Sequence, residues 1–243
     1  MKIEHNKIYF ADSYKLIKDF PPNLIDLAII DPPYKMDEHG GGGAFGNRNR
    51  PYQNDVDTLA YGMRNTMLVE LERVMKQTNL YIFCNKNQLH QYLDFYHEYY
   101  EDEKNIDLLV WHKTNPVPRC NNKYLSDLEY VLFIRDKGVE VNGSYHTLSK
   151  LYQSTTNKDD KENFSHPTIK PLPFVKNMII NSSKKGDVVL DCFSGSGTTC
   201  VAAKELGRKF IGIENDERYH KISVDRLNGI TANGQTSIFT NFD

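Results

Sequence analysis

Segments typical of strands and helices alternate along almost the whole chain of 243 residues, and this alternation limits the possible folds most strongly. A strand at 7–12, a helix at 14–20 and an apolar strand at 25–30 form a βαβ unit, which requires a parallel sheet. The pattern continues with helices at 61–75, 88–99, 173–182 and 198–206 and strands at 79–84, 106–112, 129–134, 188–191 and 210–214. The sequence therefore predicts one doubly wound α/β structure.

Composition narrows the class of protein further. Apolar residues make up 39% and charged residues 26%, as in ordinary globular proteins. The longest purely apolar run, residues 27–30, is far shorter than the about 20 residues of a membrane span. The N-terminus has no apolar signal region, so a cytoplasmic location is expected. The four cysteines lack zinc spacing, so no metal is predicted, and the net charge of −2 means that nucleic acid would need a local basic patch.

Two stretches interrupt the regular pattern. Residues 35–57 contain four consecutive glycines and the cations Arg48 and Arg50, and they predict a long, mobile surface loop. Residues 136–165 are polar and weakly patterned, which is typical of a solvated or disordered connector.

A glycine-rich turn follows the strand at 188–191. Asp191 ends this strand, and Phe193 to Thr199 form a small-residue turn that opens a helix with free N–H groups. Glu214, 19 residues past Gly195, ends the next strand, where it can accept hydrogen bonds from a ribose. Cys200 replaces the third glycine of the dinucleotide fingerprint and a phosphate loop is missing, so a nucleoside cofactor other than NAD or ATP is favoured.

The tetrapeptide Asp31-Pro32-Pro33-Tyr34 follows a strand at its carboxyl end, where ligands bind in such folds. The prolines remove two N–H donors and leave carbonyl acceptors. A carboxylate, a carbonyl and an aromatic ring together suit a flat ring with an exocyclic amine, which donates hydrogen bonds while the ring stacks on Tyr34.

The order of these motifs resembles that of the β-class amino-methylating DNA methyltransferases. DPPY stands at 31–34, HPTIKP at 166–171 and DCFSGSGTT at 191–199, and similar stretches occur at 111–116, 126–130 and 207–214. The resemblance spans about residues 7–227 apart from gaps near 35–60 and 136–164. Cys192 stands where family members more often carry proline, which alters the stiffness of the turn.

The resemblance implies a Rossmann-like methyltransferase fold, with a mostly parallel seven-stranded sheet containing one antiparallel strand. It implies a single domain over 1–243, with a mobile loop at about 35–60 and a small target-recognition insertion at about 136–164. It also implies S-adenosylmethionine as the cofactor. Its binding residues would be Asp12, Asp31, His166, Thr168, Lys170, Pro171, Asp191, Phe193, Ser194, Gly195, Ser196, Gly197, Thr198, Thr199, Glu214 and Asn215.

Within this group Asp12 would meet the adenine amine of the cofactor and Glu214 its ribose, while Thr168 and Lys170 would hold the methionine carboxylate. The catalytic residues would be Asp31, Pro32, Pro33 and Tyr34. The carboxylate of Asp31 and the carbonyl of Pro32 would accept both N–H bonds of the target amine and make its nitrogen nucleophilic.

The expected reaction is methylation of the N6 amine of adenine in a specific sequence of double-stranded DNA, with the base flipped out of the duplex. Cytosine-N4 methylation is the nearest competing reaction, and that branch of the family more often has serine in place of Asp31. A catalytically silent DNA-recognition protein is disfavoured because all the motif residues are present, and methylation of RNA or of a protein amide stays open. Candidate DNA contacts are Arg48, Arg50, Lys113, Arg119 and Lys123. The resemblance leaves open a homodimer and a cognate restriction endonuclease as partners.

Overall fold

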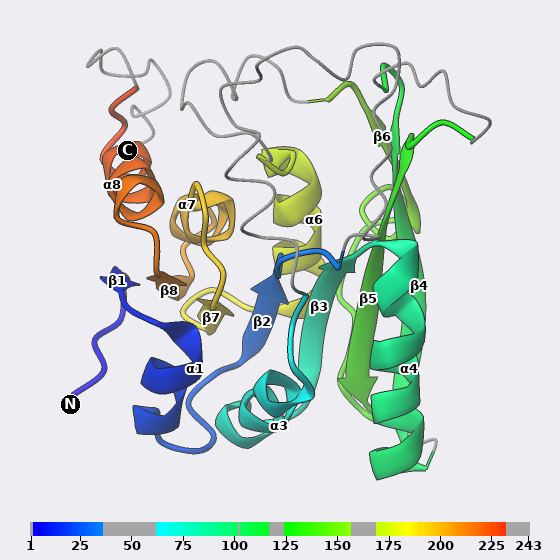
Figure 1. Ribbon diagram of the computed structural model, residues 1–243, viewed down its shortest axis with the longest axis horizontal. Helices are drawn as coiled ribbons and strands as arrows, with labels where there is room; N and C mark the ends of the chain where they lie inside the picture. The colour runs from blue at the N-terminus through cyan, green and yellow to red at the C-terminus, as the bar shows by residue number, and fades with distance from the viewer. Residues whose placement is uncertain (1, 36–61, 102, 117–123, 157–168, 232–243) are drawn as a thin grey trace.

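One sheet organises the computed structural model, which describes residues 2–35, 62–101, 103–116, 124–156 and 169–231 (Figure 1). Its strands are β1 (Lys7–Phe10), β2 (Leu27–Ile30), β3 (Asn79–Cys84), β4 (Lys104–Lys113), β5 (Leu128–Asp136), β6 (Leu151–Ser154), β7 (Val188–Asp191) and β8 (Lys209–Glu214). They are hydrogen-bonded in the order β1-β8-β7-β2-β3-β5-β4-β6.

Only β5 runs against its neighbours among these described strands. It pairs antiparallel with β3 and β4, and every other pairing in the sheet is parallel. The expectation of a mostly parallel, doubly wound sheet with one antiparallel strand is therefore confirmed.

The count of seven strands is wrong, because the described part of the sheet has eight. The additional strand is β6, which lies within the stretch whose sequence is typical of an irregular connector. It is only four residues long and pairs with the edge of β4, where Leu151 lies opposite Val110. The four residues LYQS show no strand pattern of their own, and they form a strand because they pair with β4.

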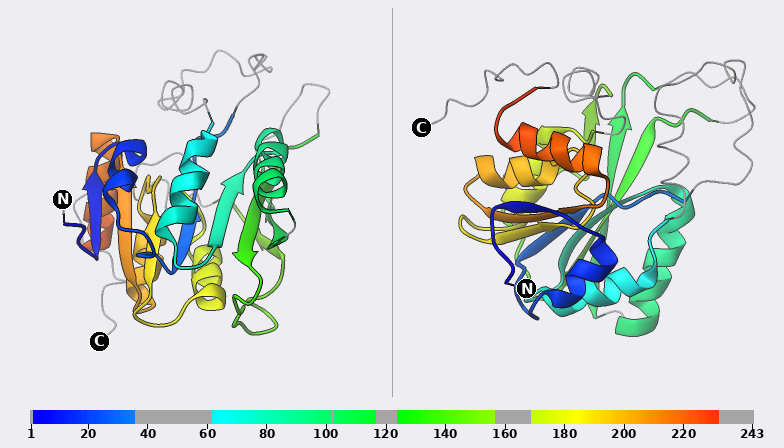
Figure 2. Two further views of the ribbon diagram at one scale, coloured as in Figure 1. Left: turned by 90° about the horizontal axis from the view of Figure 1, so that it is seen from below. Right: turned by 60° about the vertical axis from the view of Figure 1, so that its left-hand side comes forward.

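Helices cover both faces of the sheet (Figure 2). They are α1 (Ser13–Leu16), α3 (Asn65–Val74), α4 (Lys86–Tyr100), α6 (Leu172–Ser182), α7 (Thr198–Glu205) and α8 (Glu217–Leu227), with a 3₁₀ turn, η1 (Ile17–Asp19). Alternate residues of the strands enter two separate cores: Ala28 and Ile30 pack with α1, α3 and α4, whereas Leu27 and Ile29 pack with α6 and α7.

Aspartate side chains cap the starts of two helices. The side chain of Asp12 caps α1, because its carboxylate accepts a hydrogen bond from the backbone N–H of Tyr14. The first residue of this helix, Ser13, donates its hydroxyl to the carbonyl of Cys192. The helix α8, which the sequence pattern did not predict, begins at the cap Asp216, whose side chain accepts from the N–H of Tyr219.

The order of the strands creates a crevice between β2 and β7. These strands are neighbours, but the chain continues from β2 to β3 on one side and from β7 to β8 on the other. In an open α/β sheet the carboxyl ends of two such strands form a gap in which ligands bind. Asp31 directly follows β2 and Asp191 ends β7, so both carboxyl groups lie at this gap.

Gly212 in β8 is required by close packing against the glycine-rich turn. A Cβ atom at this position would lie 2.7 Å from Ser194 Oγ and 2.8 Å from Cys200 Sγ. We expect Gly212→Ala to lower the free energy of unfolding by about 1–3 kcal/mol, as overpacking does. Urea denaturation measures this, with the exposed Val69→Ala as a control expected to change by at most about 0.5 kcal/mol. Equal stability of Gly212→Ala and the wild type would contradict the packing argument.

Candidate active site

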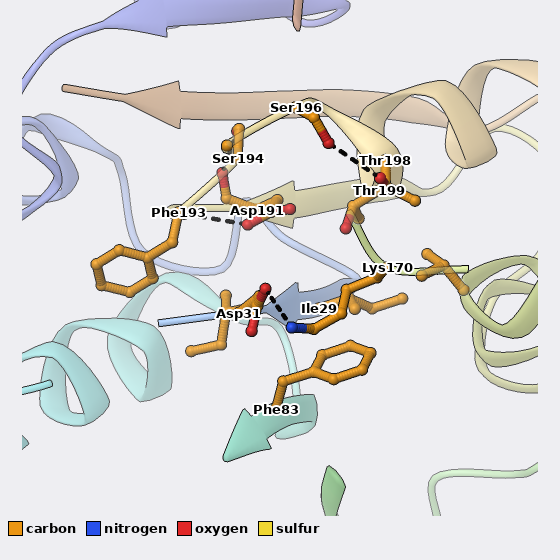
Figure 3. A pocket seen from close by; sticks show the side chains of 13 residues that line it. Ile29, Asp31, Phe83, Lys170, Asp191, Phe193, Ser194, Ser196, Thr198 and Thr199 are labelled. Carbon is orange, nitrogen blue, oxygen red and sulfur yellow. Dashed lines mark hydrogen bonds and ion pairs between the residues drawn. The ribbon is translucent and has the colours of Figure 1, made fainter. Parts of the chain in front are cut away.

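A cavity of about 360 Å³, open mouth included, lies at the crevice between β2 and β7 (Figure 3). Its wall combines the end of β2, the end of β7, the turn after β7 and the start of α7. The lining residues are Ile29, Ile30, Asp31, Phe83, Lys170, Val175, Asp191, Phe193, Ser194, Gly195, Ser196, Thr198 and Thr199. The structure thus brings together the segments at 31–34, 169–171 and 191–199 that the sequence predicted to cooperate.

Lys170 carries the central charge of this site. Its Nζ lies 2.7 Å from Asp31 Oδ2 and 3.0 Å from Glu129 Oε1. It also lies 5.1 Å from the ring centroids of Tyr34 and Phe83. The side chain is 8% exposed, so the ammonium group exchanges hydration for two carboxylates and two aromatic faces.

Tyr34 belongs to the same network. Its hydroxyl donates to Glu129 Oε1 over 2.6 Å, and burial together with the charges of Asp31 and Glu129 raises the pKa of the phenol. The preceding residues are also held, because the carbonyl of Pro33 accepts from the side-chain amide of Gln88 over 3.0 Å. The tetrapeptide is therefore fixed by hydrogen bonds to β5 and α4.

The two carboxylates of the network differ in acidity. Burial raises the pKa of Asp31, and the attraction of Lys170 opposes this rise without cancelling it. Burial also raises the pKa of Glu129, but the ammonium groups of Lys170 and Lys113 outweigh it, so the pKa falls to about 2. Glu129 is therefore the firmly ionised carboxylate of the network. Asp31 is the more basic of the two and lines the cavity.

The glycine-rich turn forms the opposite wall. Gly195 and Gly197 have positive φ angles of 49° and 76°, and the N–H of Gly197 donates to the carbonyl of Ser194. The helix α7 then begins without a side-chain cap. Its first turn is held from α8, where the buried guanidinium of Arg226 donates to Thr198 Oγ1 over 2.8 Å.

Glu214 is bound to the backbone of its surroundings. One carboxylate oxygen accepts from the N–H of Gly195 over 2.7 Å, and the other accepts from Asn215 and Asp216 over 2.9 Å each. Burial raises its pKa. A carboxylate has about four acceptor positions, so one remains for a ligand hydroxyl.

Several predicted cofactor residues lie beside the cavity wall rather than in it. Asp12 caps α1, Asn215 is exposed, and Pro171 and Glu214 are buried. A Cβ atom at Gly197 would lie 3.0 Å from Ser223 Cβ, so this glycine permits packing of the turn on α8.

Further predicted residues lie outside the described part of the chain. These are His166, Thr168, Arg48, Arg50, Arg119 and Lys123, together with nearly all of the loop expected at 35–60. Lys113 is described: its Nζ lies 3.1 Å from Glu129 Oε2 and 5.0 Å from the centroid of the Trp111 ring. Its contact with DNA phosphate stays a prediction.

The sequence assigned no role to two residues that hold the site together, Glu129 and Arg226. Glu129 lies in the stretch 126–130, which is one of those that carry the family resemblance. The sequence feature that could have identified it is an acid at the start of an otherwise apolar strand. Arg226 lies on α8, and an arginine on a largely polar helix carries no such signal. Within the described residues, no group of three His, Cys, Asp or Glu side chains is placed to hold a metal.

Comparison with known proteins places the chain in a family. Residues 25–225 match the family model N6_N4_Mtase, described as DNA methylase. The chain is 31% identical over 242 residues to the type II methyltransferase M2.LlaDCHI of Lactococcus lactis subsp. cremoris, covering 93% of this chain and 90% of the relative. It is 30% identical to the type II methyltransferase M2.DpnII of Streptococcus pneumoniae, covering 89% and 87%. The chain therefore belongs to the N6/N4 DNA methylase family, and the protein is a DNA methyltransferase.

Solved structures agree with this assignment. The crystal structure of the M1.HpyAVI–SAM complex is similar, with a TM-score of 0.66, 25% identity and coverage of 90% of this chain and 98% of that one. The cytosine-N4-specific PvuII DNA methyltransferase gives a TM-score of 0.67 at 17% identity, covering 93% and 87%, and shows the common fold alone. No helix among the described residues is long and apolar enough to span a membrane.

Asp191 makes the stability of the ligand-free protein depend on pH. Burial raises its pKa from the ordinary value of 3.8 to about 7, so ionisation destabilises the fold as pH rises through this window. We expect Asp191→Asn, which can still accept from the N–H of Phe193, to be more stable than the wild type at pH 8. The advantage should shrink toward pH 4 by up to about 1.4 kcal/mol per pH unit. Urea denaturation at four pH values measures it, and an advantage that is constant with pH would contradict the assignment.

Proposed function

We propose that the protein transfers a methyl group from S-adenosylmethionine to the N6 amine of adenine in double-stranded DNA. The observation that carries the proposal is the Asp31 carboxylate in the cavity wall, directly after β2 and facing the glycine-rich turn across the crevice. The aspartate at this position supports adenine over cytosine-N4, since the resemblance associates serine with cytosine. The N6/N4 family itself includes both amines.

Residues on the opposite wall, and Glu214 beside it, fit this cofactor. The uncapped start of α7 offers backbone N–H groups to a carboxylate, the glycine turn lets a ligand approach the backbone, and Glu214 keeps an acceptor for a hydroxyl. S-adenosylmethionine, when bound, would supply a methyl group on a sulfonium, from which the neutral thioether leaves readily. The carboxyl groups of Asp31 and Asp191 line the crevice, and because burial raises their pKa values, a cationic ligand bound there would favour their ionised forms.

Asp31 acts on the amine of the flipped base. Its carboxylate accepts an N–H bond and withdraws the nitrogen lone pair from conjugation with the ring, while the Pro32 carbonyl accepts the second N–H and Tyr34 stacks on the base. The raised pKa of Asp31 is consistent with a strong acceptor. Because Lys170 Nζ lies 2.7 Å from Asp31, the amine must share this carboxylate with the ammonium group.

The remaining features expected from the sequence belong to the same proposal. The chain acts as a single methyltransferase domain in which the segments near 35–60 and 136–164 recognise DNA. β-class motif order, the DPPY tetrapeptide as the catalytic motif, a homodimer and a partner restriction endonuclease rest on the family resemblance.

Asp31 provides the direct test. We expect Asp31→Ala and Asp31→Asn each to lower the single-turnover rate on adenine-containing duplexes by at least about a hundredfold, the scale for losing one preorganised stabilising group. Asn loses the charge and turns a donor toward a donor. Binding to DNA should persist.

Asp26→Asn is the matched control for these variants. Asp26 precedes β2 at its other end and also pairs with a lysine, Lys76, over 2.6 Å. It should retain the wild-type rate. Substantial transfer by Asp31→Ala would overturn the mechanism, whereas transfer by the wild type to cytosine instead of adenine would overturn only the substrate.

A further inference from the structure

Glu129 belongs to the charged network but does not line the cavity. It is buried, 7% exposed, and contacts Lys170, which does line the cavity. Its Oε1 accepts from the Tyr34 hydroxyl over 2.6 Å and from Lys170 Nζ over 3.0 Å, while its Oε2 lies 3.1 Å from Lys113 Nζ. One carboxylate therefore contacts Tyr34 and Lys170 simultaneously.

The charge of Glu129 determines how the N–H donors of Lys170 are shared between its two carboxylate partners. The ammonium group lies between Glu129 and Asp31, at 3.0 and 2.7 Å, and the pair of anions divides its hydrogen bonds. If Glu129 were neutral, Asp31 would be the only anion among the described residues within ion-pair distance of Lys170. The ammonium group would then move fully onto Asp31 and occupy acceptor positions that the target amine needs.

We propose that Glu129 is a positioning residue for methyl transfer, which holds Lys170 and Tyr34 in place so that Asp31 stays available to the target amine. This inference rests on the proposed function of the site. Glu129 contacts neither ligand; it acts through the ammonium group that competes for Asp31 and through the ring that stacks on the base.

The proposal predicts the sign of a pH effect. Asp31 interacts electrostatically with Lys170, Tyr34 and Glu129, with Asp191 across the cavity, and with the neutral side chains of Cys84 on β3 and Tyr92 on α4. Burial and the negative charge of Glu129 raise its pKa, and Lys170 lowers it. Removing the charge of Glu129 takes away a repulsion and concentrates Lys170 on Asp31, and both changes lower the pKa of Asp31. The acidic limb of the rate should therefore move to lower pH although the maximal rate falls.

The chain contains a matched control for a purely structural loss. Glu72 accepts from the Tyr96 hydroxyl over 3.0 Å and from Lys104 Nζ over 3.1 Å, and Lys104 in turn lies 2.6 Å from Asp136. This second network shares a lysine between two carboxylates with a tyrosine on the glutamate, and it also contains Thr78, whose hydroxyl donates to Glu72. It lies at the other end of the strands from the cavity, where β4 begins and β5 ends.

The experiment compares Glu129→Gln, Glu129→Asp and Glu72→Gln in the full chain. Single-turnover methylation of an adenine-containing duplex is measured from pH 5.5 to 9 at saturating S-adenosylmethionine and DNA, and cofactor affinity is measured by calorimetry. We expect Glu129→Gln to lower the maximal rate by at least about tenfold, as misplacement of reacting groups does, and to shift the acidic limb downward. Glu129→Asp, which keeps the charge, should recover part of the rate. Cofactor affinity is read separately because Lys170 is also a predicted contact of the methionine carboxylate, and the rate at saturating S-adenosylmethionine does not depend on that affinity.

The outcomes separate this inference from the proposed function. Glu72→Gln should lose stability in urea denaturation and keep the wild-type maximal rate and pH profile. A rate of Glu129→Gln equal to that of the wild type or of Glu72→Gln, or an acidic limb that stays or moves upward, would overturn the positioning role. A wild-type protein that methylates no adenine would overturn the proposed function instead.

Discussion

The ammonium group of Lys170 joins three segments that lie far apart in the sequence. Asp31 follows β2, Glu129 lies at the start of β5 and Lys170 precedes α6, yet both carboxylates lie within 3.0 Å of the lysine Nζ. A buried lysine without anions would lose its charge or unfold its surroundings, and two neighbouring carboxylates without a cation would repel each other. Each of these three charged groups therefore depends on the others, which explains how separated motifs form one site.

The reversal of β5 makes this arrangement possible. In a wholly parallel sheet each strand brings its last residues to the ligand-binding edge, as β2 does with Asp31 and β4 with Lys113. Because β5 runs the other way, it brings its second residue, Glu129, to this edge. The antiparallel strand thus contributes a carboxylate from its beginning, next to residues that follow or end the parallel strands.

The sequence predicted the features that depend on local pattern. Apolar strands, the turn with Gly195 and Gly197 and the acid after β2 follow from spacing and backbone requirements alone, and the structure places them at one crevice. It did not predict the role of Glu129, because burial beside Lys170 depends on strand order rather than on neighbours in the chain. The strand β6 was missed for a similar reason, since its order comes from pairing with β4.

The two lysine-centred networks show why residue type alone does not reveal a site. Lys104 with Glu72 and Asp136 has the same chemistry as Lys170 with Glu129 and Asp31. The first network closes the edge where β4 starts, and its groups satisfy one another. In the second network, Asp31 and Lys170 also face a cavity at the point where the strand order diverges. A charge network can act on a ligand only when the topology leaves one of its members open, and here that member is Asp31.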